Sequence, residues 1–332
     1  MANLMISTLC NQDCPYCFTA DYRNLYPLSN RHFLSLADVE NRLNFLMRSN
    51  IDQARLMGGE PTLHPQFVEL VACVRMAGLK VVVFSNGLIP ASVLDCLASL
   101  PVSECMVLIN VSDPQYIHQN ISTQQLDTIQ RLGTRAMLGF NIYRPDFQLD
   151  FLLPIVAETG CRPSIRLGIA HPCLSASNQY IHPNQYVAVG AKIARFARLA
   201  ASAGVTIEFD CGFVRCMFSE PDWEALCTLK ADVGRRCNPI LDIDIEGRVM
   251  HCYPLAGLGS LPMTADSDAP ALRQAFELRV QPYRRAGIFP ECSCCSFKAA
   301  GECSGGCLSA TIRRFRRAPS ASLVVPRQGI QQ

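Results

Sequence analysis

Three cysteines near the N-terminus have the type and spacing of an iron-sulfur site. Cys10, Cys14 and Cys17 follow the pattern CxxxCxxC, and the aromatic residue Phe18 comes directly after them. Three thiolates on one short loop can bind three irons of a four-iron, four-sulfur cluster and leave the fourth iron without a protein ligand. An open coordination position is what separates a catalytic metal site from a closed structural one. This spacing also arises by chance in cysteine-rich chains, so its context must support it.

Two more segments carry groups that can contact a ligand. Residues 58–61 read GGEP and residues 85–87 read SNG. Glycine lets the backbone approach a ligand closely, and a carboxylate can bind an ammonium group. A glycine pair before proline is by itself more often a turn. We nevertheless predict that the cofactor-binding residues include Gly58, Gly59, Glu60, Pro61, Ser85 and Asn86.

Short apolar runs alternate with amphipathic stretches from Met1 to about Cys211, which predicts βα units and a parallel sheet. Active-site residues gather at the carboxyl ends of such strands, in barrels and in open sheets alike. The three motifs follow the first three predicted strands, and we therefore expect them to meet at one edge. The seven predicted strands are Leu4–Leu9, Ala54–Met57, Val81–Phe84, Met106–Val111, Ala136–Ile142, Ser164–Ile169 and Val205–Phe209.

Helices are predicted between these strands from caps and apolar stripes. Ser35 precedes an apolar stripe and has Asp38 three residues on, as in a capping box. After Pro65, apolar residues fall at i, i+3, i+4 and i+7, and Gly78 supplies the stop. A long helix is predicted over 184–203.

Composition limits the classes of function. The 332 residues are 49% hydrophobic, and the net charge is only +2 from 30 basic and 28 acidic residues. Neither nucleic acid nor an anionic membrane is therefore expected as a partner. No signal sequence and no apolar run long enough to span a membrane is present, so we expect a cytoplasmic protein. Eighteen cysteines in such a protein indicate metal binding, the alternative being a secreted disulfide scaffold.

The pattern changes past Cys211, where strand and helix alternation fades and Cys, Gly and Pro become frequent. We predict three parts in the chain. These are an α/β barrel domain over residues 1–210, a small cysteine-rich iron-sulfur domain over 211–315, and a frayed tail over 316–332.

The segment CNQDCPYCF at residues 10–18, followed by GGEP and SNG, resembles the signature of the radical S-adenosylmethionine (SAM) superfamily. The resemblance implies a partial (β/α)6 TIM-type barrel in which SAM chelates the open iron of the cluster. It also implies reductive cleavage of SAM to a 5′-deoxyadenosyl radical that abstracts a substrate hydrogen, with an external reductant such as flavodoxin or ferredoxin. Later strand ends offer further SAM contacts, which are Asn110, Ser112, Asn141 and Arg166.

The later cysteines resemble the SPASM domain, whose reduced form is called twitch and which carries auxiliary four-iron clusters. Cys237, Gly247 and Cys252 fit Cx9Gx4C, and a second pattern, CxxCx7CxxxC, is formed by Cys292, Cys295, Cys303 and Cys307. The spacer between Cys295 and Cys303 is longer than the family's, and no cysteine follows Cys307.

The resemblance therefore implies one or two auxiliary clusters. One would use Cys237, Cys252 and Cys307, with Cys216 or Cys211 as a fourth ligand. The other would use Cys292, Cys295 and Cys303, completed by Cys294, by another group or by an open iron. Zinc is the alternative metal. Cys173 is a candidate donor of a hydrogen atom to the substrate. We expect the remaining cysteines, at positions 73, 96, 105, 161 and 227, to be small residues of the hydrophobic core.

SPASM proteins mostly modify ribosomally made peptides, and we predict oxidation, crosslinking or epimerisation of such a peptide. The alternatives are a twitch-type dehydrogenase or epimerase acting on a small molecule such as an aminocyclitol, and a non-catalytic iron-sulfur scaffold or electron carrier. In sulfatase maturases an Asp base follows the cysteine equivalent to Cys252, whereas this chain has Tyr253 there. Tyr253 is our candidate catalytic residue, and the other candidates for the base are Asp210, Asp242 and Asp244.

Overall fold

The structure is a computed structural model of the 332-residue chain, and it describes residues 1–20, 31–112, 122–175, 177–229, 231 and 237–316. None of the helices in these ranges is long and apolar enough to cross a membrane.

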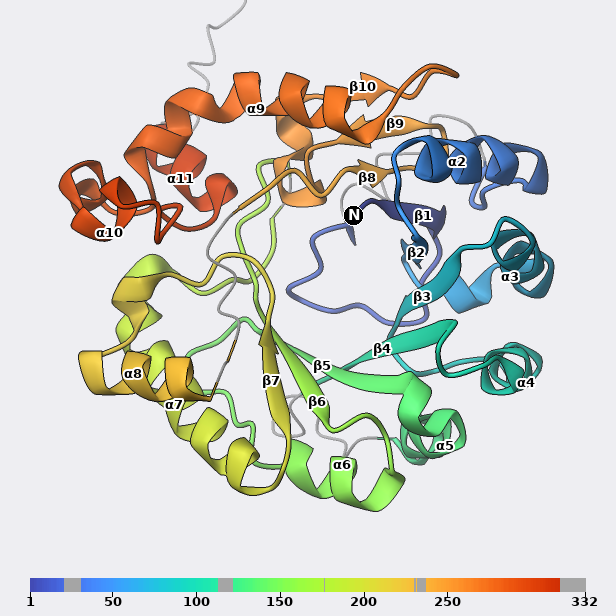
Figure 1. Cartoon of the computed structure of the whole chain (residues 1–332), viewed down its shortest axis with the longest axis horizontal. Coiled ribbons are helices and arrows are strands. Elements are labelled where there is room, and N and C mark those ends of the chain that lie inside the picture. Colours follow the sequence, from blue (N-terminus) through green and yellow to red (C-terminus); the bar gives the residue numbers. More distant parts are fainter. Residues whose placement is uncertain (21–30, 113–121, 176, 230, 232–236, 317–332) are drawn as a thin grey trace, which may run out of the picture.

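One sheet organises the fold (Figure 1). Its ten strands lie in the order β10-β9-β8-β1-β2-β3-β4-β5-β6-β7, so that the first seven strands follow the sequence and are parallel. Strands β7 and β10 end the order and the sheet is not closed, which confirms the partial barrel. The strands are β1 (Asn3–Ser7), β2 (Gln53–Gly58), β3 (Lys80–Ser85), β4 (Cys105–Val111), β5 (Ala136–Ile142), β6 (Ser164–Ile169), β7 (Thr206–Phe209), β8 (Asp242–Ile243), β9 (Arg248–Met250) and β10 (Leu261–Pro262).

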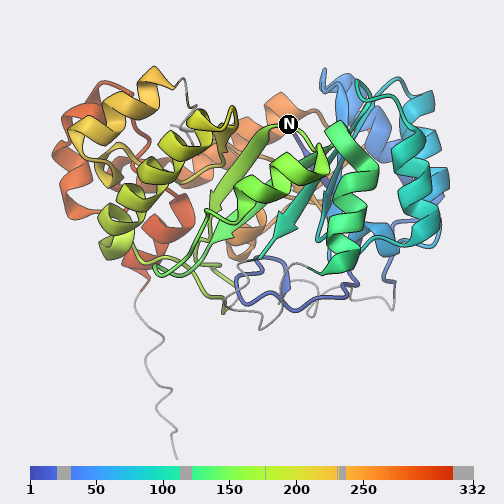
Figure 2. The same ribbon diagram turned by 90° about the horizontal axis from the view of Figure 1, so that it is seen from below.

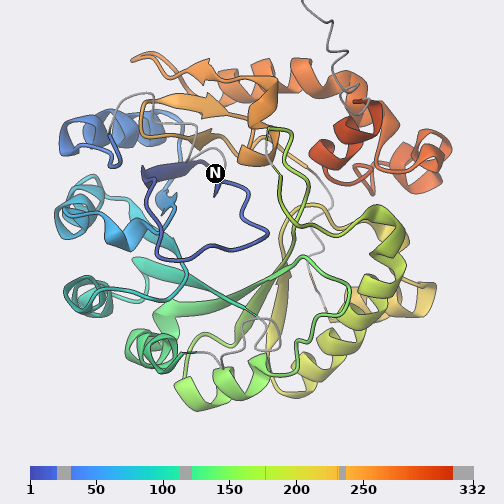
Figure 3. The ribbon, with the colours of Figure 1, turned by 180° about the vertical axis from the view of Figure 1, so that it is seen from behind.

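Helices surround the sheet on its outer side (Figures 1 and 3). The α-helices are α2 (Leu36–Arg48), α3 (Phe67–Met76), α4 (Ala91–Ser99), α5 (Thr123–Leu132), α6 (Leu152–Thr159), α7 (Tyr186–Ser202), α8 (Glu220–Thr228), α9 (Ala269–Ala286), α10 (Ser296–Ala299) and α11 (Leu308–Phe315). The 3-10 helices are η1 (Pro61–Leu63), η2 (Gly133–Arg135), η3 (Pro183–Gln185), η4 (Arg215–Met217), η5 (Tyr253–Leu258) and η6 (Pro290–Cys294). One large hydrophobic core fills the space between the sheet and the helices.

Local sequence signals explain the element boundaries. The Ser35 hydroxyl accepts a hydrogen bond from the Asp38 N–H at 3.2 Å and starts α2, as predicted. Gly78 follows α3 with a φ of 72°, a left-handed conformation that favours glycine. The predicted seven strands are all present, with ends that differ by at most two residues. The long helix begins at Tyr186 rather than at residue 184, because residues 183–185 form η3.

The part of the chain after residue 237 continues the barrel sheet. Strand β8 pairs in parallel with β1, with Asn3 opposite Asp242. The Asn3 side-chain amide donates to Asp242 Oδ1 at 2.7 Å. Helices α9 and α11 pack together around a small second core of Cys237, Leu255, Val280, Leu308 and Ile312. Figure 2 shows this region beside the barrel helices. The division at residues 210 and 211 stays a prediction.

The remaining cysteines are less uniform than predicted. Cys105 and Cys161 are buried in the core, and Cys73 and Cys96 are half-buried. Cys227, however, is exposed on α8, so its predicted place in the core is wrong. Leu226 is the only buried residue of α8, and Cys227, the next residue on this short helix, faces solvent.

Gly190 gives a test of the packing between α7 and the chain after β7. A Cβ at this position would lie 2.1 Å from the Met217 carbonyl oxygen. Replacing a helical glycine with alanine usually stabilises a protein by about 0.5–1 kcal/mol. We expect Gly190→Ala instead to lower the free energy of unfolding by about 1–3 kcal/mol, because backbone must shift. Urea denaturation measures the change.

Ala188→Gly, at an exposed position of the same helix, is the matched control and should cost about 1 kcal/mol or less. A Gly190→Ala protein more stable than the wild type would contradict the close contact with Met217.

Candidate functional site

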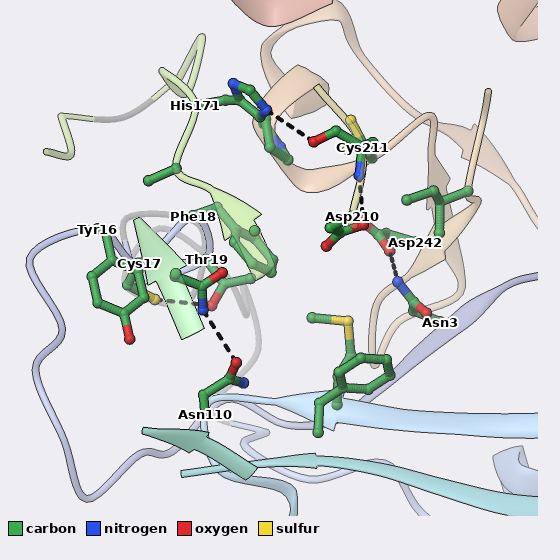
Figure 4. A pocket seen from close by; sticks show the side chains of 18 of the residues that line it. Asn3, Tyr16, Cys17, Phe18, Thr19, Asn110, His171, Asp210, Cys211 and Asp242 are labelled. Atoms are coloured by element: carbon green, nitrogen blue, oxygen red, sulfur yellow. Dashed lines mark hydrogen bonds between the residues drawn. The ribbon is translucent and has the colours of Figure 1, made fainter. Parts of the chain in front are cut away.

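A single cavity of about 260 Å³ joins the predicted motifs. It extends from Asn3 and Arg55, near the starts of β1 and β2, to the loops that follow these strands. Figure 4 shows part of its lining, with Tyr16 and Cys17 across from His171 and Cys211. The cavity is lined by two groups of cysteines, the first being Cys10, Cys14 and Cys17 and the second Cys211, Cys237, Cys252 and Cys307.

The first cysteine group lies on the loop after β1, where the sequence placed it. All three side chains are half-buried. Burial and then the neighbouring Cys17 raise the pKa of Cys14 to about 11, with a further contribution from Cys10, so the three thiols are close together. A hydrogen bond of 2.7 Å from the Glu60 N–H to the Leu9 carbonyl fixes this loop to the GGEP motif. These residues can hold three irons of one cluster.

Tyr16 lies inside this loop and accounts for two of the predicted SAM contacts. Its hydroxyl forms hydrogen bonds with Ser112 and Asn141, and burial raises its pKa. The Asn141 amide also donates to the Asn110 side-chain oxygen at 3.2 Å. Asn110 and Asn141 line the cavity, and Ser112 does not. The structure therefore places Ser112 as a support for Tyr16.

Glu60 connects the strand ends instead of facing the cavity. Its carboxylate accepts hydrogen bonds from the Ser85 hydroxyl at 3.0 Å and from the Asn86 N–H at 2.8 Å. It also accepts from the Thr62 hydroxyl at 2.7 Å, and its side chain is buried. Gly58, Gly59, Ser85 and Asn86 line the cavity, whereas Glu60 and Pro61 do not. Glu60 thus positions the SNG motif against the GGEP motif.

Gly58 is required by strand packing. A Cβ at residue 58 would lie 2.1 Å from the Ser7 carbonyl oxygen of β1. The Gly59 N–H donates to the same carbonyl at 2.8 Å. The first glycine of this motif therefore allows β1 and β2 to approach each other, which the sequence reading had attributed to approach of a ligand.

A charged group occupies another part of the lining. Arg166, predicted to contact SAM, forms an ion pair with Asp210 at 2.7 Å. Its guanidinium lies 5.6 Å from the Phe84 ring centroid, and that of Arg55 lies 4.9 Å from it. Burial lowers the pKa of Arg55, while Asp210 and Asp242 act in the opposite direction. These side chains offer a substrate both positive and negative partners.

Asp242 is the most buried carboxylate of the cavity lining, at 3% exposure. Its Oδ2 accepts from the Tyr253 backbone N–H at 2.7 Å, and its Oδ1 accepts from Asn3. Burial raises the pKa of Asp242 to about 6 in spite of these bonds. A carboxylate with such a pKa can take up or release a proton near neutral pH.

Tyr253, our candidate catalytic residue, is buried beside this carboxylate. Its ring stacks on Phe18 with centroids 6.1 Å apart, and it does not line the cavity, although its neighbours Cys252 and Pro254 do. Asp244 lies outside the cavity lining and pairs with Arg248 at 2.7 Å. Of the candidates for the base, the cavity contains Asp210 and Asp242.

The second cysteine group is an inner site of four thiols, Cys211, Cys237, Cys252 and Cys307. Burial raises the pKa of Cys252 well above its ordinary value, and Cys237, Cys307 and Cys211 add to the effect. Cys211 therefore lies with this group, and it is one of the two residues, with Cys216, that the sequence analysis named as a fourth ligand. In the sequence only its position just after β7 marked it.

His171 is a neighbour of the inner site that the sequence reading missed. It is buried, lines the cavity and lies 3.3 Å from the Cys211 carbonyl through Nε2. Although burial acts in the opposite direction, the charge and hydrogen bond of His171 hold the pKa of Cys307 down to about 7. A Cβ at Gly212 would lie 1.9 Å from His171 Nε2, so glycine makes room for the ring. Only its place after β6 could have indicated this residue.

Cys216 lies apart from the inner site. Desolvation raises its pKa to about 11, and the cysteines that add to the effect are Cys303, Cys292 and Cys295. Within the described ranges, no three His, Cys, Asp or Glu side chains converge on the position of one metal ion. Thiolates of a four-iron cluster each bind a different iron, so they need not converge on one point. Cys173 is buried, and its thiol lies 3.7 Å from the Phe18 carbonyl oxygen, outside the cavity lining.

The buried carboxylate of Asp242 predicts a dependence of stability on pH. The folded protein keeps the Asp242 proton up to about pH 6, whereas an unfolded Asp releases it near pH 4. Wild-type stability is therefore lost as the pH rises between these values. The quantity to compare is the free energy of unfolding of Asp242→Asn minus that of the wild type. We expect this difference to be larger at pH 7 than at pH 4, by about 3 kcal/mol or less. Urea denaturation of both proteins at the two pH values measures it.

Any cost of the lost hydrogen bond in Asp242→Asn is present at both pH values and cancels in this comparison. Asp95→Asn, at an exposed position of α4, is the control and should show little such difference. An Asp242 effect no larger than the Asp95 effect would contradict the raised pKa.

Comparisons with known proteins agree with this geometry. Residues 4–147 match the family model described as the radical SAM superfamily. The GTP 3′,8-cyclase of Haemophilus influenzae strain PittEE is 27% identical over 142 residues, which cover 42% of this chain and 41% of that protein. The chain thus matches about two fifths of the length of this curated relative.

Among solved structures, Streptococcus suis SuiB bound to S-adenosylmethionine has a TM-score of 0.65 at 14% identity, covering 94% of this chain and 74% of SuiB. SuiB bound to the precursor peptide SuiA has a TM-score of 0.57 at 11% identity, covering 81% of this chain and 63% of SuiB. AnSMEcpe with bound AdoMet has a TM-score of 0.64 at 15% identity, covering 92% of this chain and 85% of that protein. The fold is shared with these proteins, and residues 4–147 of this chain match the model of the radical SAM superfamily.

Proposed function

We propose that this chain cleaves SAM reductively at Cys10, Cys14 and Cys17 and uses the resulting radical to oxidise, crosslink or epimerise a ribosomally made peptide. The observation that carries the proposal is the single cavity, which the three cysteines share with the other two strand-end motifs and with the inner four-cysteine site. A site for radical formation and a second metal site thus face the same space.

The residues present fit a four-iron cluster with one open iron. Three half-buried thiols lie on one loop, and none of the eighteen cysteines forms a disulfide. When bound there, such a cluster supplies the electron that cleaves SAM into methionine and a 5′-deoxyadenosyl radical, which removes a hydrogen atom from the substrate. Asn86 and Gly59 line the same end of the cavity and are positioned to hold SAM.

The inner site fits an auxiliary cluster. Cys211, Cys237, Cys252 and Cys307 give four thiolates, a full set of ligands for a four-iron cluster. His171 is placed to donate a hydrogen bond to the Cys307 thiolate, a kind of contact that tunes metal sites. Asp242, between Asn3 and the residue after Cys252, is our candidate to accept the substrate proton. Asp242 accepts a hydrogen bond from the Tyr253 N–H. It therefore lies next to Tyr253, the residue that the sequence analysis named as the catalytic candidate.

A peptide substrate is supported by the shared fold of SuiB, which has been solved with its precursor peptide SuiA. A small-molecule substrate remains the second candidate, since the relative that matches the barrel region is a GTP 3′,8-cyclase. The high thiol content suits a reducing cytoplasm, where flavodoxin or ferredoxin would supply electrons.

SAM cleavage tests the proposed chemistry. After anaerobic reconstitution with iron and sulfide and reduction with dithionite, we expect the wild type to form 5′-deoxyadenosine and methionine. Cys14→Ala should lower this activity by at least about 100-fold, because one ligand of the cluster is lost. Cys227→Ala, which changes an exposed cysteine outside both cysteine groups of the cavity, should retain the wild-type rate. Liquid chromatography with mass spectrometry measures both products.

Substrate is added in two arms, short peptides encoded beside the gene and small molecules of neighbouring pathways. A mass change in a peptide supports the proposal, and a change only in a small molecule replaces the peptide with the second candidate. If the wild type forms no 5′-deoxyadenosine in either arm, the chain is a non-catalytic iron-sulfur protein.

A further inference from the structure

A second set of cysteines lies beyond the inner site, in the segment between α9 and α11. Cys292 lies in η6, Cys295 follows it, and Cys303 comes after α10. All three are half-buried. The same segment carries Cys294, which the sequence analysis named as one group that could complete this set.

The structure brings Cys216 to these three from a different part of the chain. Cys216 lies in η4, after the last barrel strand β7. The cysteines that act on its thiol are Cys303, Cys292 and Cys295, in that order of strength. The four thiols come from segments more than seventy residues apart in the sequence, and three of them are close enough to act on the fourth.

Side-chain packing holds η4 against the cysteine segment independently of the thiols. The Arg215 guanidinium carbon lies 5.1 Å from the Phe297 ring centroid in α10 and 4.7 Å from that of Trp223. Arg215 is buried and also forms an ion pair with Glu220. Val214, one residue earlier, also packs there, since a Cβ at Gly306 would lie 3.1 Å from a Val214 methyl group. The two residues before Cys216 are thus fixed on the segment that carries the other three cysteines.

The backbone around these thiols is shaped to leave them room. A Cβ at Gly287, whose φ is 75°, would lie 2.8 Å from the Cys292 sulfur. The Gly305 N–H donates a hydrogen bond to the Cys303 sulfur at 3.3 Å. Hydrogen bonds to sulfur tune iron-sulfur clusters. Glycine at 287 thus leaves room for the Cys292 sulfur, and the backbone of Gly305 contacts the Cys303 sulfur.

Cys294 is the competing fourth ligand, and its placement is different. Cys294 is exposed, as Cys216 is, but its thiol donates to the Glu291 carbonyl at 3.4 Å, within its own 3-10 helix. Cys294 is not among the cysteines that act on Cys216.

We propose that Cys216, Cys292, Cys295 and Cys303 form an outer site that binds a second auxiliary four-iron cluster, with Cys216 as its fourth ligand. The proposal rests on the proposed function, which supplies the first cluster and the inner site. Cys216 thus takes the role for which the sequence analysis had considered Cys294. It also leaves the inner site with its own complete set of four.

The experiment counts iron in a background without the first cluster. The triple variant Cys10→Ala, Cys14→Ala, Cys17→Ala should bind about eight irons per chain after anaerobic reconstitution, four in each auxiliary site. Adding Cys216→Ala should lower the content to about four irons if the whole outer cluster is lost. If only the iron bound by Cys216 is lost, the content should be about seven irons, with the electron paramagnetic resonance signal of an oxidised three-iron cluster. Adding Cys294→Ala, the matched control, should change neither the iron content nor the spectrum. Circular dichroism establishes that each variant is folded.

The outcomes separate this proposal from the proposed function. Eight irons with an unchanged spectrum after Cys216→Ala would overturn it, and so would a loss of iron in Cys294→Ala but not in Cys216→Ala. If the triple variant itself binds four irons, Cys211→Ala identifies the occupied site, and loss of that iron overturns the outer site. If the triple variant binds only zinc or no metal, the auxiliary clusters of the proposed function fail as a whole.

Discussion

The pairing of β8 with β1 is the contact on which the candidate site depends. Strand β1 leads into the loop of Cys10, Cys14 and Cys17, and β8 leads through a tight hairpin to Cys252. Asp242 joins the two, since one oxygen accepts from Asn3 and the other from the backbone N–H of Tyr253, both at 2.7 Å. This pairing brings a segment more than two hundred residues away to the open edge of the barrel. The pairing places the first cysteine group of the cavity and Cys252 of the second.

The charges inside the barrel follow from the same arrangement. A buried carboxylate is costly unless it is hydrogen-bonded, and the raised pKa of Asp242 shows that its two bonds do not fully offset burial. Arg55 and the Arg166–Asp210 pair share the cavity with it, so that positive and negative groups are balanced there. Such a lining costs stability, and polar groups of this kind are concentrated where a substrate or cofactor is bound.

The sequence allowed the barrel and its first cluster to be predicted, because short apolar runs mark strands β1 to β6 and the three motifs follow β1, β2 and β3. It did not reveal β8, whose two residues carry no periodicity. The roles of Cys211 and Cys216 were equally hidden, since both follow β7 within a few residues and only tertiary packing separates them. Tyr253 and Asp242 show the same limit. The position next to Cys252 indicated Tyr253, but the hairpin brings the carboxylate of the preceding strand to that place.

The proposed inner and outer sites are connected by one short turn. Cys303 and Cys307 are assigned to different sites and are four residues apart, so their Cα atoms are separated by at most about 14 Å. Gly305 and Gly306 between them have φ values of 82° and 87°, which only glycine adopts readily, and these make the turn compact. Cys307 is buried beside the cavity, whereas Cys216 of the outer site is exposed. Two clusters held in this way would connect the cavity with the protein surface. An electron removed from a substrate would then have a path out of the cavity that does not pass through the first cluster.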